Sequence, residues 1–478
     1  MSYTFFWHDY ETFGAVPRRD RPAQFAGIRT DSELNEIGSP VEVFCRPSPD
    51  YVPEPQACLI THITPQQCLE DGVSEQEFAQ VVERELGATG TVGVGYNSIR
   101  FDDEVTRHLF WRNLIDPYAR EWQNQCGRWD ILDVVRTAYA LRPKGIQWPM
   151  GTDGKVSFRL ELLTQANGIA HEAAHDAVSD VRATIALARL IRDKQPKLFE
   201  FCFALHKKDR VLDEIGRVGA MGKPFLHISG MYPVERGCLS VVWPLAIHPT
   251  NKNEIIVWDL AHDPRELLSL SVDDIKARMF TRTDDLAEGV TRLPIKTIHI
   301  NKSPIVIGNL KTLSAEMADK WSIDMEQIQA HAQRAAELPD MSQTWHGVYQ
   351  REFDEALDVE QDLYGGFVGN GDRRVLNDLR GLDAQSIARA KPSFVDARLE
   401  ELFWRYRARN FPHTLNAQEQ NLWRQQCAQR VLHGAAGGLT AHAALAQIDD
   451  LAIHADEEGQ MVLGDLYEYI SELQAYLS

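Results

Sequence analysis

Hydrophobic and polar positions alternate along the chain in three different ways, which predict three structural segments. From residue 3 to about residue 196, short apolar runs alternate with longer amphipathic stretches. The apolar runs predict strands at 3–8 and 93–96, and the amphipathic stretches predict helices at 74–86, 102–115 and 180–193. Strands interleaved with helices are typical of a layered α/β domain.

The second and third segments have different patterns. Between about 196 and 349 the apolar runs are shorter and richer in β-branched residues. They predict strands at 225–228, 239–242, 254–259 and 297–300, with helices at 272–280 and 315–321. From about 350 onward helical patterns dominate, at 397–406, 417–432 and 467–476. We therefore predict an α/β domain over 1–195, a β-rich domain over 196–349 and an all-helical domain over 350–478.

Composition and charge restrict the class of protein. The 478 residues are 44% hydrophobic and 25% charged, which is ordinary for a globular protein of two or three domains. No run approaches the ~18 apolar residues of a membrane helix, and the start does not resemble a signal peptide. Seven scattered cysteines without CxxC spacing argue against disulfides or a zinc knuckle and favour a reducing cytoplasm. The net charge of −19 argues against nonspecific coating of nucleic acid, so any binding would be confined to a basic channel.

Two carboxylates stand at the end of the first predicted strand. Asp9 and Glu11 are two residues apart, and residues i and i+2 of a strand point to the same face, so both can reach one cation. Carboxylate oxygens are the ligands that hard divalent ions such as Mg²⁺ prefer. A solvated strand edge would give the same pattern, so this pair alone does not establish a metal site.

Two further acidic residues lie at predicted helix starts. Asp102 follows the strand at 93–96 and a turn, where an ordinary helix N-cap would also place it. Asp180 opens the helix at 180–193, five residues after His175. Residues five apart on a helix differ by about 140° in direction, so the two can face one site only if His175 precedes the helix or lies in its first turn. Taken alone, His175 could equally be a structural or surface histidine.

Together these elements predict phosphodiester hydrolysis. Four carboxylates and one histidine, each at the end of an element in an α/β domain, suit a two-metal site. In such a site two Mg²⁺ ions hold the scissile phosphate, and one of them lowers the pKa of the attacking water. A nearby histidine would remove a proton from that water as general base.

The chain resembles the bacterial exodeoxyribonuclease I family. The resemblance is carried by HDYETFG, GYNSIRFDDEVTRHLFWRN, ANGIAHEAAHDAVSDVRATIALARL, NKNEIIVWDL and RARNFPHTL, and the order of the five candidate residues is similar to that of the DEDDh 3′→5′ exonuclease superfamily. It extends over nearly the whole chain. It implies a ribonuclease H-like exonuclease domain, an SH3-like domain and a C-terminal helical domain. The implied activity is processive 3′→5′ degradation of single-stranded DNA to mononucleotides, in DNA repair and recombination.

The resemblance also implies roles for individual residues. Asp9, Glu11, Asp102 and Asp180 match the metal-binding carboxylates, which would hold two Mg²⁺ ions with Mn²⁺ as a substitute, and His175 matches the general base. Glu11, Thr12 and Phe13 are expected at the terminal nucleotide and Arg159 at the substrate. Basic residues interleaved with aromatics suit single-strand binding, and they add Arg107, Arg136, Arg142 and Lys144 beside Trp129, Tyr139 and Trp148. The same reasoning extends to Trp243, Lys302, Arg405, Arg407 and Arg409, although the arginines could equally form a solvated helix face.

One protein partner is also implied for the chain. The resemblance implies binding of the acidic C-terminal tail of single-stranded DNA-binding protein, with Arg142 and Lys311 as candidate rim residues. We expect a monomer that does not associate with membranes.

Three alternative functions stay open. They are another DEDDh enzyme, a non-enzymatic single-strand-binding scaffold and a magnesium-dependent nucleotide phosphatase. The long chain after the predicted nuclease domain argues against the first, and the complete set of five residues argues against the second.

Overall fold

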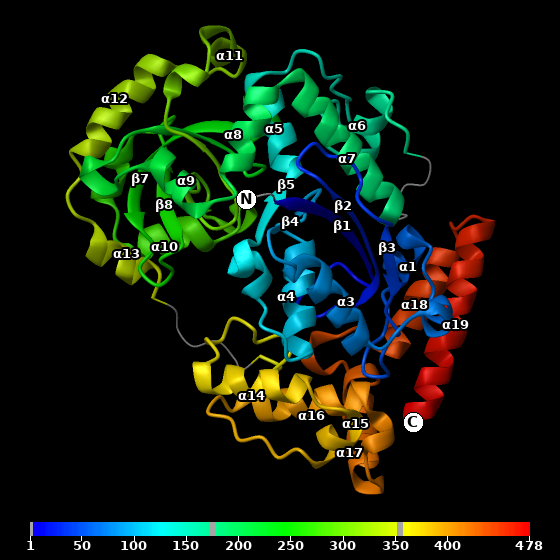
Figure 1. Ribbon diagram of the computed structural model, residues 1–478. Coiled ribbons are helices and arrows are strands. Elements are labelled where there is room, and N and C mark those ends of the chain that lie inside the picture. Colours follow the sequence, from blue (N-terminus) through cyan, green and yellow to red (C-terminus); the bar gives the residue numbers. More distant parts are fainter. Residues whose placement is uncertain (1–2, 172–176, 351–356) are drawn as a thin grey trace. The chain divides into compact units, whose positions relative to one another are not determined.

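A computed structural model describes residues 3–171, 177–350 and 357–478 (Figure 1). The chain forms two compact units. The first consists of Met1–Gly127, His171–Ile185 and Glu355–Ser478, and the second of Arg128–Ala170 and Ala186–Asp354. The predicted domain boundaries near 195 and 349 stay predictions, because the units follow contacts in space and not the order of the chain.

The first sheet is built around the predicted N-terminal strand. It contains β1 (Thr4–Thr12), β2 (Pro22–Thr30), β3 (Val41–Phe44), β4 (Thr91–Gly95) and β5 (Gly127–Asp130), in the order β3-β2-β1-β4-β5. β1 is antiparallel to β2 and parallel to β4. The strands predicted at 3–8 and 93–96 are thereby confirmed as parts of β1 and β4, whereas β2 and β3 were not predicted.

Two predicted helices complete this core. They are α3 (Glu75–Gly87), which begins at a capping box between Ser74 and Glu77, and α4 (Asp102–Arg112). Phe6 and Tyr10 of β1 share a hydrophobic cluster with Phe78 of α3 and Leu109 of α4. Both helices therefore pack on the face of β1 opposite to that of Asp9, since alternate strand residues point to opposite faces.

The C-terminal region is helical throughout its described residues, as predicted. Its helices are α14 (Asn370–Arg380), α15 (Ala384–Arg389), α16 (Arg398–Asn410), α17 (Ala417–Val431), α18 (Ala441–Ala452) and α19 (Glu457–Leu477). Helices α17 to α19 share a hydrophobic cluster with Phe13, Ala23 and Tyr51 from the N-terminal part of the chain. Two short helices, α1 (Pro55–Thr61) and α2 (Pro65–Asp71), contribute Cys58 and Cys68 to the same cluster. The start and the end of the chain thus form one core.

The second unit contains an antiparallel sheet, which confirms the β-rich character predicted for residues 196–349. Its strands are β6 (Phe225–Ile228), β7 (Leu239–Ile247), β8 (Glu254–Asp259), β9 (Ile295–His299) and β10 (Ile305–Ile307), in the order β10-β6-β7-β8-β9. Its helices are α5 (Ile131–Leu141), α6 (Leu160–Ala166), α8 (Pro196–Ala204), α9 (Lys208–Ile215), α10 (Val272–Phe280), α11 (Ala315–Lys320), α12 (Met325–Ala336) and α13 (Ser342–Val348). The bounds of β6, β8 and α10 agree with the prediction, and β9 begins two residues before the predicted strand at 297–300.

Two properties of the whole chain agree with the composition. All seven cysteines are buried thiols, consistent with the expected lack of a disulfide framework. Among the residues described, no helix combines the length and the apolar character needed to cross a membrane.

Candidate metal centre

β1 presents two carboxylates on one face near its end. Phe5 and Trp7 precede Asp9 and Glu11 at alternate positions, so this face changes from apolar to acidic along the strand. Pairing fixes the strand, because Asp9 lies opposite Ala26 of β2 and Glu11 opposite Gln24. The register shifts directly after Glu11, which ends the regular pairing next to the acidic pair.

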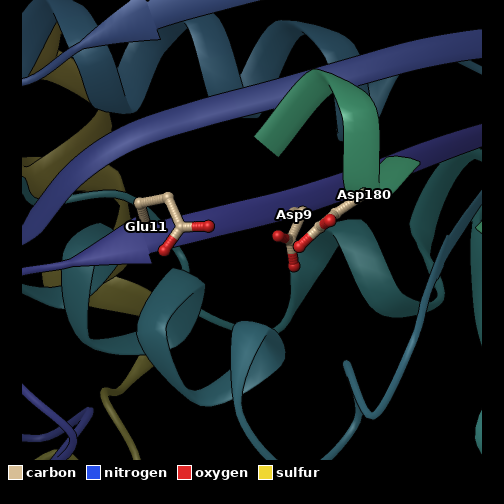
Figure 2. A group of neighbouring side chains, drawn as sticks. All are labelled: Asp9, Glu11 and Asp180. Atoms are coloured by element: carbon tan, nitrogen blue, oxygen red, sulfur yellow. The ribbon is translucent and has the colours of Figure 1, made fainter. Parts of the chain in front are cut away.

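A third carboxylate comes from the first turn of α7 (Ala177–Lys194). One possible ligand atom from each of Asp9, Glu11 and Asp180 lies within 4.8 Å of the others, and we refer to these three residues as the carboxylate cluster. Figure 2 shows Asp9 and Asp180 pointing toward each other, while Glu11 lies farther along β1. The fold therefore brings together three carboxylates that are distant in sequence.

Asp102 reaches the same strand by a different contact. It is the first residue of α4 and is buried, and its Oδ1 accepts a hydrogen bond of 3.2 Å from the backbone N–H of Tyr10. Tyr10 lies between Asp9 and Glu11, so Asp102 is attached to the segment that carries them. The next residue, Asp103, is paired with the buried guanidinium of Arg120 at 2.5 Å, which fixes the start of α4. Of the four predicted metal ligands, the structure gathers three in the cluster and places Asp102 beside them.

The electrostatics of the cluster fit a bound cation. The pKa of Asp9 is raised to about 8, chiefly because burial disfavours the charged form and then because the charge of Asp180 repels it. A divalent cation would counteract both effects, since it supplies positive charge at the carboxylate oxygens. The oxygen donors and the raised pKa of Asp9 therefore both fit a divalent metal ion.

Two histidines precede Asp180 in the sequence, and the structure describes one of them. His175, the expected general base, lies outside the described residues. His171 is described, and its Nε2 is 2.5 Å from Oδ1 of Asp180. Sequence reasoning missed His171, although it stands in the same motif four residues before His175. A contact between residues nine apart in the sequence matches no regular helix or strand spacing, so only the presence of a second histidine could have drawn attention to it.

The predicted DNA contacts in the first unit have three different environments. Thr12 is partly exposed, and its hydroxyl donates to the carbonyl of Gly14 at 2.8 Å. Phe13 is 1% exposed and its ring belongs to the core. Arg107 is buried and forms ion pairs of 2.7 Å with both Glu104 and Glu121. In this structure the Phe13 ring packs in the core and the Arg107 guanidinium pairs with carboxylates, and their contact with DNA stays a prediction.

The basic candidates of the second unit are more accessible. The side chain of Arg159 is 71% exposed and pairs with Glu161. Arg142 is exposed, and its Nη1 donates to the carbonyl oxygens of Leu141 and Thr312. Arg136 is partly buried and pairs with Asp133 at 2.7 Å. Lys144 and Lys311 are exposed and Lys302 is partly buried.

The aromatic and C-terminal candidates are mostly structural. Trp129, Tyr139 and Trp243 are buried core residues, whereas Trp148 is partly exposed. Arg405 pairs with Asp358 at 2.8 Å, Arg407 with Glu419 at 2.9 Å and Arg409 with Asp50 at 2.9 Å. These three arginines pair with acidic partners and are largely buried, so they do not form a solvated face, and their contact with DNA stays a prediction.

Comparison with known proteins places the whole chain in one family. A family model described as Exonuclease matches residues 6–188, Exonuclease I SH3-like domain matches 206–351 and Exonuclease I C-terminal domain matches 357–473. The exodeoxyribonuclease I of Haemophilus influenzae is 43% identical over 471 residues, covering 98% of each chain.

Two solved structures agree in fold with this chain. Exonuclease I of Methylocaldum szegediense has a TM-score of 0.93 at 46% identity, with 99% of this chain and 100% of that one covered. The zinc-bound complex of Escherichia coli exonuclease I with single-stranded DNA has a TM-score of 0.91 at 41% identity, with 99% and 100% covered. The chain carries the carboxylate cluster within the residues matched by the Exonuclease model. It belongs to the exonuclease I family and is a DNA exonuclease of the DEDD superfamily.

Proposed function

We propose that this enzyme hydrolyses single-stranded DNA from the 3′ end with two Mg²⁺ ions and releases mononucleotides processively. The observation that supports the proposal most directly is the convergence of Asp9, Glu11 and Asp180 within 4.8 Å at the end of β1. A family membership that covers nearly the whole chain supplies the substrate class. The single-stranded DNA bound by the E. coli relative is the substrate we infer for this chain.

The chain's own residues would divide the work between binding and proton transfer. Asp9, Glu11 and Asp180, with Asp102 beside them, would hold the metal ions. When bound, these ions would neutralise the scissile phosphate and lower the pKa of the attacking water. We assign proton removal from that water to His175 on the family pattern alone.

Substrate contacts and partners extend the proposal. Glu11 and Thr12 are at the end of β1, where the terminal nucleotide would lie, and the exposed cation of Arg159 suits a phosphate. Arg142 and Arg136 are proposed as further contacts to the DNA. Arg142 donates to Thr312, the neighbour of the exposed Lys311, so these two cations lie close enough to serve as the rim of a site for the acidic tail of single-stranded DNA-binding protein. We further propose a cytoplasmic monomer that acts in DNA repair and recombination.

Digestion of a 5′-labelled single-stranded oligonucleotide with Mg²⁺ tests the activity. Shortening from the 3′ end is expected, and both EDTA and Asp9→Ala should reduce it, the variant by about 10²-fold or more because a charged group at the reacting centre is lost. Glu70→Ala removes an exposed carboxylate of the same unit and should leave the rate unchanged.

Duplex DNA, RNA and a mononucleotide ester separate the alternatives. Equal trimming of RNA would keep the site but contradict the DNA assignment. Cleavage of the mononucleotide ester without cleavage of the polymer would favour the phosphatase. Binding without cleavage, in the wild type with Mg²⁺, would favour the scaffold.

A further inference from the structure

His171 contacts one member of the carboxylate cluster, Asp180, without belonging to the cluster itself. Its Nε2 lies 2.5 Å from Oδ1 of Asp180, and the two side chains are 7% and 18% exposed. An ionised carboxylate can only accept hydrogen bonds, so when Asp180 is ionised as a metal ligand, the N–H at Nε2 of His171 is the donor and Oδ1 of Asp180 the acceptor. Among the described residues, the group of possible ligand atoms within 4.8 Å of one another contains Asp9, Glu11 and Asp180 but not His171.

Asp180 comes from a different element than the other two carboxylates. Asp9 and Glu11 are carried by β1, which is paired with β2 in regular register from Phe5 to Glu11. Asp180 lies in the first turn of α7, and its side chain points toward that of Asp9 (Figure 2). The contact with His171 restrains the Asp180 side chain at its Oδ1 atom.

We propose that His171 is a positioning residue, which holds the Asp180 carboxylate in the orientation that completes the metal site. Hydrogen bonds to metal-binding carboxylates fix their orientation, and their loss costs about 10–100-fold in metal affinity or activity. This role differs from that of a general base, because His171 acts through Asp180 and not on the attacking water. The inference rests on the proposed function, in which Asp180 binds metal.

Calorimetric titration of the EDTA-treated, full-length protein with Mn²⁺, without DNA, tests the role directly. His171→Ala should weaken Mn²⁺ binding by about 10–100-fold. His171→Gln keeps an N–H donor at a similar reach and should recover most of the affinity. His62→Ala is the matched control, because it removes a histidine paired with a carboxylate, Glu458, on the exposed surface of the same unit. It should bind Mn²⁺ like the wild type.

The kcat and KM for cleavage of single-stranded DNA, measured at steady state, provide a second test of the role of His171. With saturating metal, His171→Ala should recover most of the wild-type kcat, and its KM for DNA should be unchanged. The proposal is overturned if His171→Ala binds Mn²⁺ normally, if His171→Gln is no better than His171→Ala, or if kcat stays low at saturating metal. If His171→Ala does not fold, as judged by thermal unfolding, His171→Leu replaces it because it fills the space without a donor. Failure of the wild type to bind Mn²⁺ would instead contradict the proposed function.

Discussion

Asp9 is placed where its negative charge is unfavourable unless a cation is bound. Burial and the facing charge of Asp180 raise its pKa from 3.8 to about 8. In the unfolded chain the same carboxyl would ionise near its ordinary pKa. Between about pH 4 and pH 8 the folded state therefore binds more protons at Asp9 than the unfolded state does, so this residue lowers the free energy of unfolding as the pH rises.

Asp9→Asn should therefore change the stability of the metal-free protein in a pH-dependent way. The variant removes the ionisable group, so its melting temperature in EDTA should exceed that of the wild type at pH 9. The difference should shrink toward pH 5, where folded Asp9 is protonated. Thermal unfolding at both pH values measures it, and Mg²⁺ should stabilise the wild type more than the variant at pH 9. A difference that does not change with pH would contradict the assigned pKa of Asp9.

Some site residues could be predicted from the sequence, whereas the contact partners of others could not. Asp9, Glu11 and Asp180 could be predicted, because their spacing and element ends are visible in one dimension. The partners of Arg405 and Arg409 could not, because Asp358 and Asp50 are far away along the chain and become neighbours only in the folded core. His171 belongs to the same class, since its contact with Asp180 joins residues nine apart, a separation that no regular helix or strand spacing predicts.

At the scale of elements, the strand that most escaped prediction is β2. Its sequence PAQFAGIRT begins with proline and contains small residues, so it lacks the β-branched pattern of a typical strand. The structure explains the small residue at Gly27, because a Cβ there would lie 2.3 Å from the ring of Phe6. By contrast, the first and last residues of β6 and β8, which contain β-branched and aromatic residues, agree with the prediction.

Helix α19 provides a prediction for one element. Leu466 is fully buried in the cluster that joins the C-terminal helices to Phe13, whereas Tyr467, the next residue, is 47% exposed. Leu466→Ala should lower the free energy of unfolding by about 2–5 kcal/mol, because it leaves a cavity in the core. Tyr467→Ala should change it by about 0.5 kcal/mol or less. Urea denaturation of both variants measures the difference, and equal effects would contradict the described face of α19.

At the scale of the whole molecule, a buried ion network ties distant segments of the first unit together. Glu360 accepts from Arg21 and Arg430 at 2.9 Å and from Arg409 at 2.5 Å. Burial alone would raise the pKa of Glu360, but the surrounding arginines hold it well below its ordinary value. The network thus connects Arg21, the residue before β2, with α16 and α17 by charges that are shielded from water.

Removal of the charge at the centre of this network should be strongly destabilising. Glu360→Gln keeps the shape of the side chain but leaves the arginines undercompensated, which costs about 3–5 kcal/mol for a broken buried pair. Glu235→Gln breaks an exposed pair with Lys155, whose side chains are both 52% exposed, and should change the free energy of unfolding little. Urea denaturation at neutral pH compares the two, and a Glu360→Gln variant as stable as the wild type would show that the buried charge is not needed.

The same connections predict that the nuclease segment cannot fold without the end of the chain. A chain that stops at residue 350 keeps Asp9, Glu11 and Asp180, but it loses α16 to α19 and with them the partners of Phe13, Ala23 and Tyr51. Phe13 follows Glu11 by two residues, so an exposed core at this point would disturb the end of β1 and the carboxylate cluster. We expect the shortened chain to aggregate on size-exclusion chromatography and to cleave DNA at a small fraction of the wild-type rate. A monodisperse, fully active fragment would mean that the C-terminal helices serve only the substrate, and that β1 is held by its own sheet.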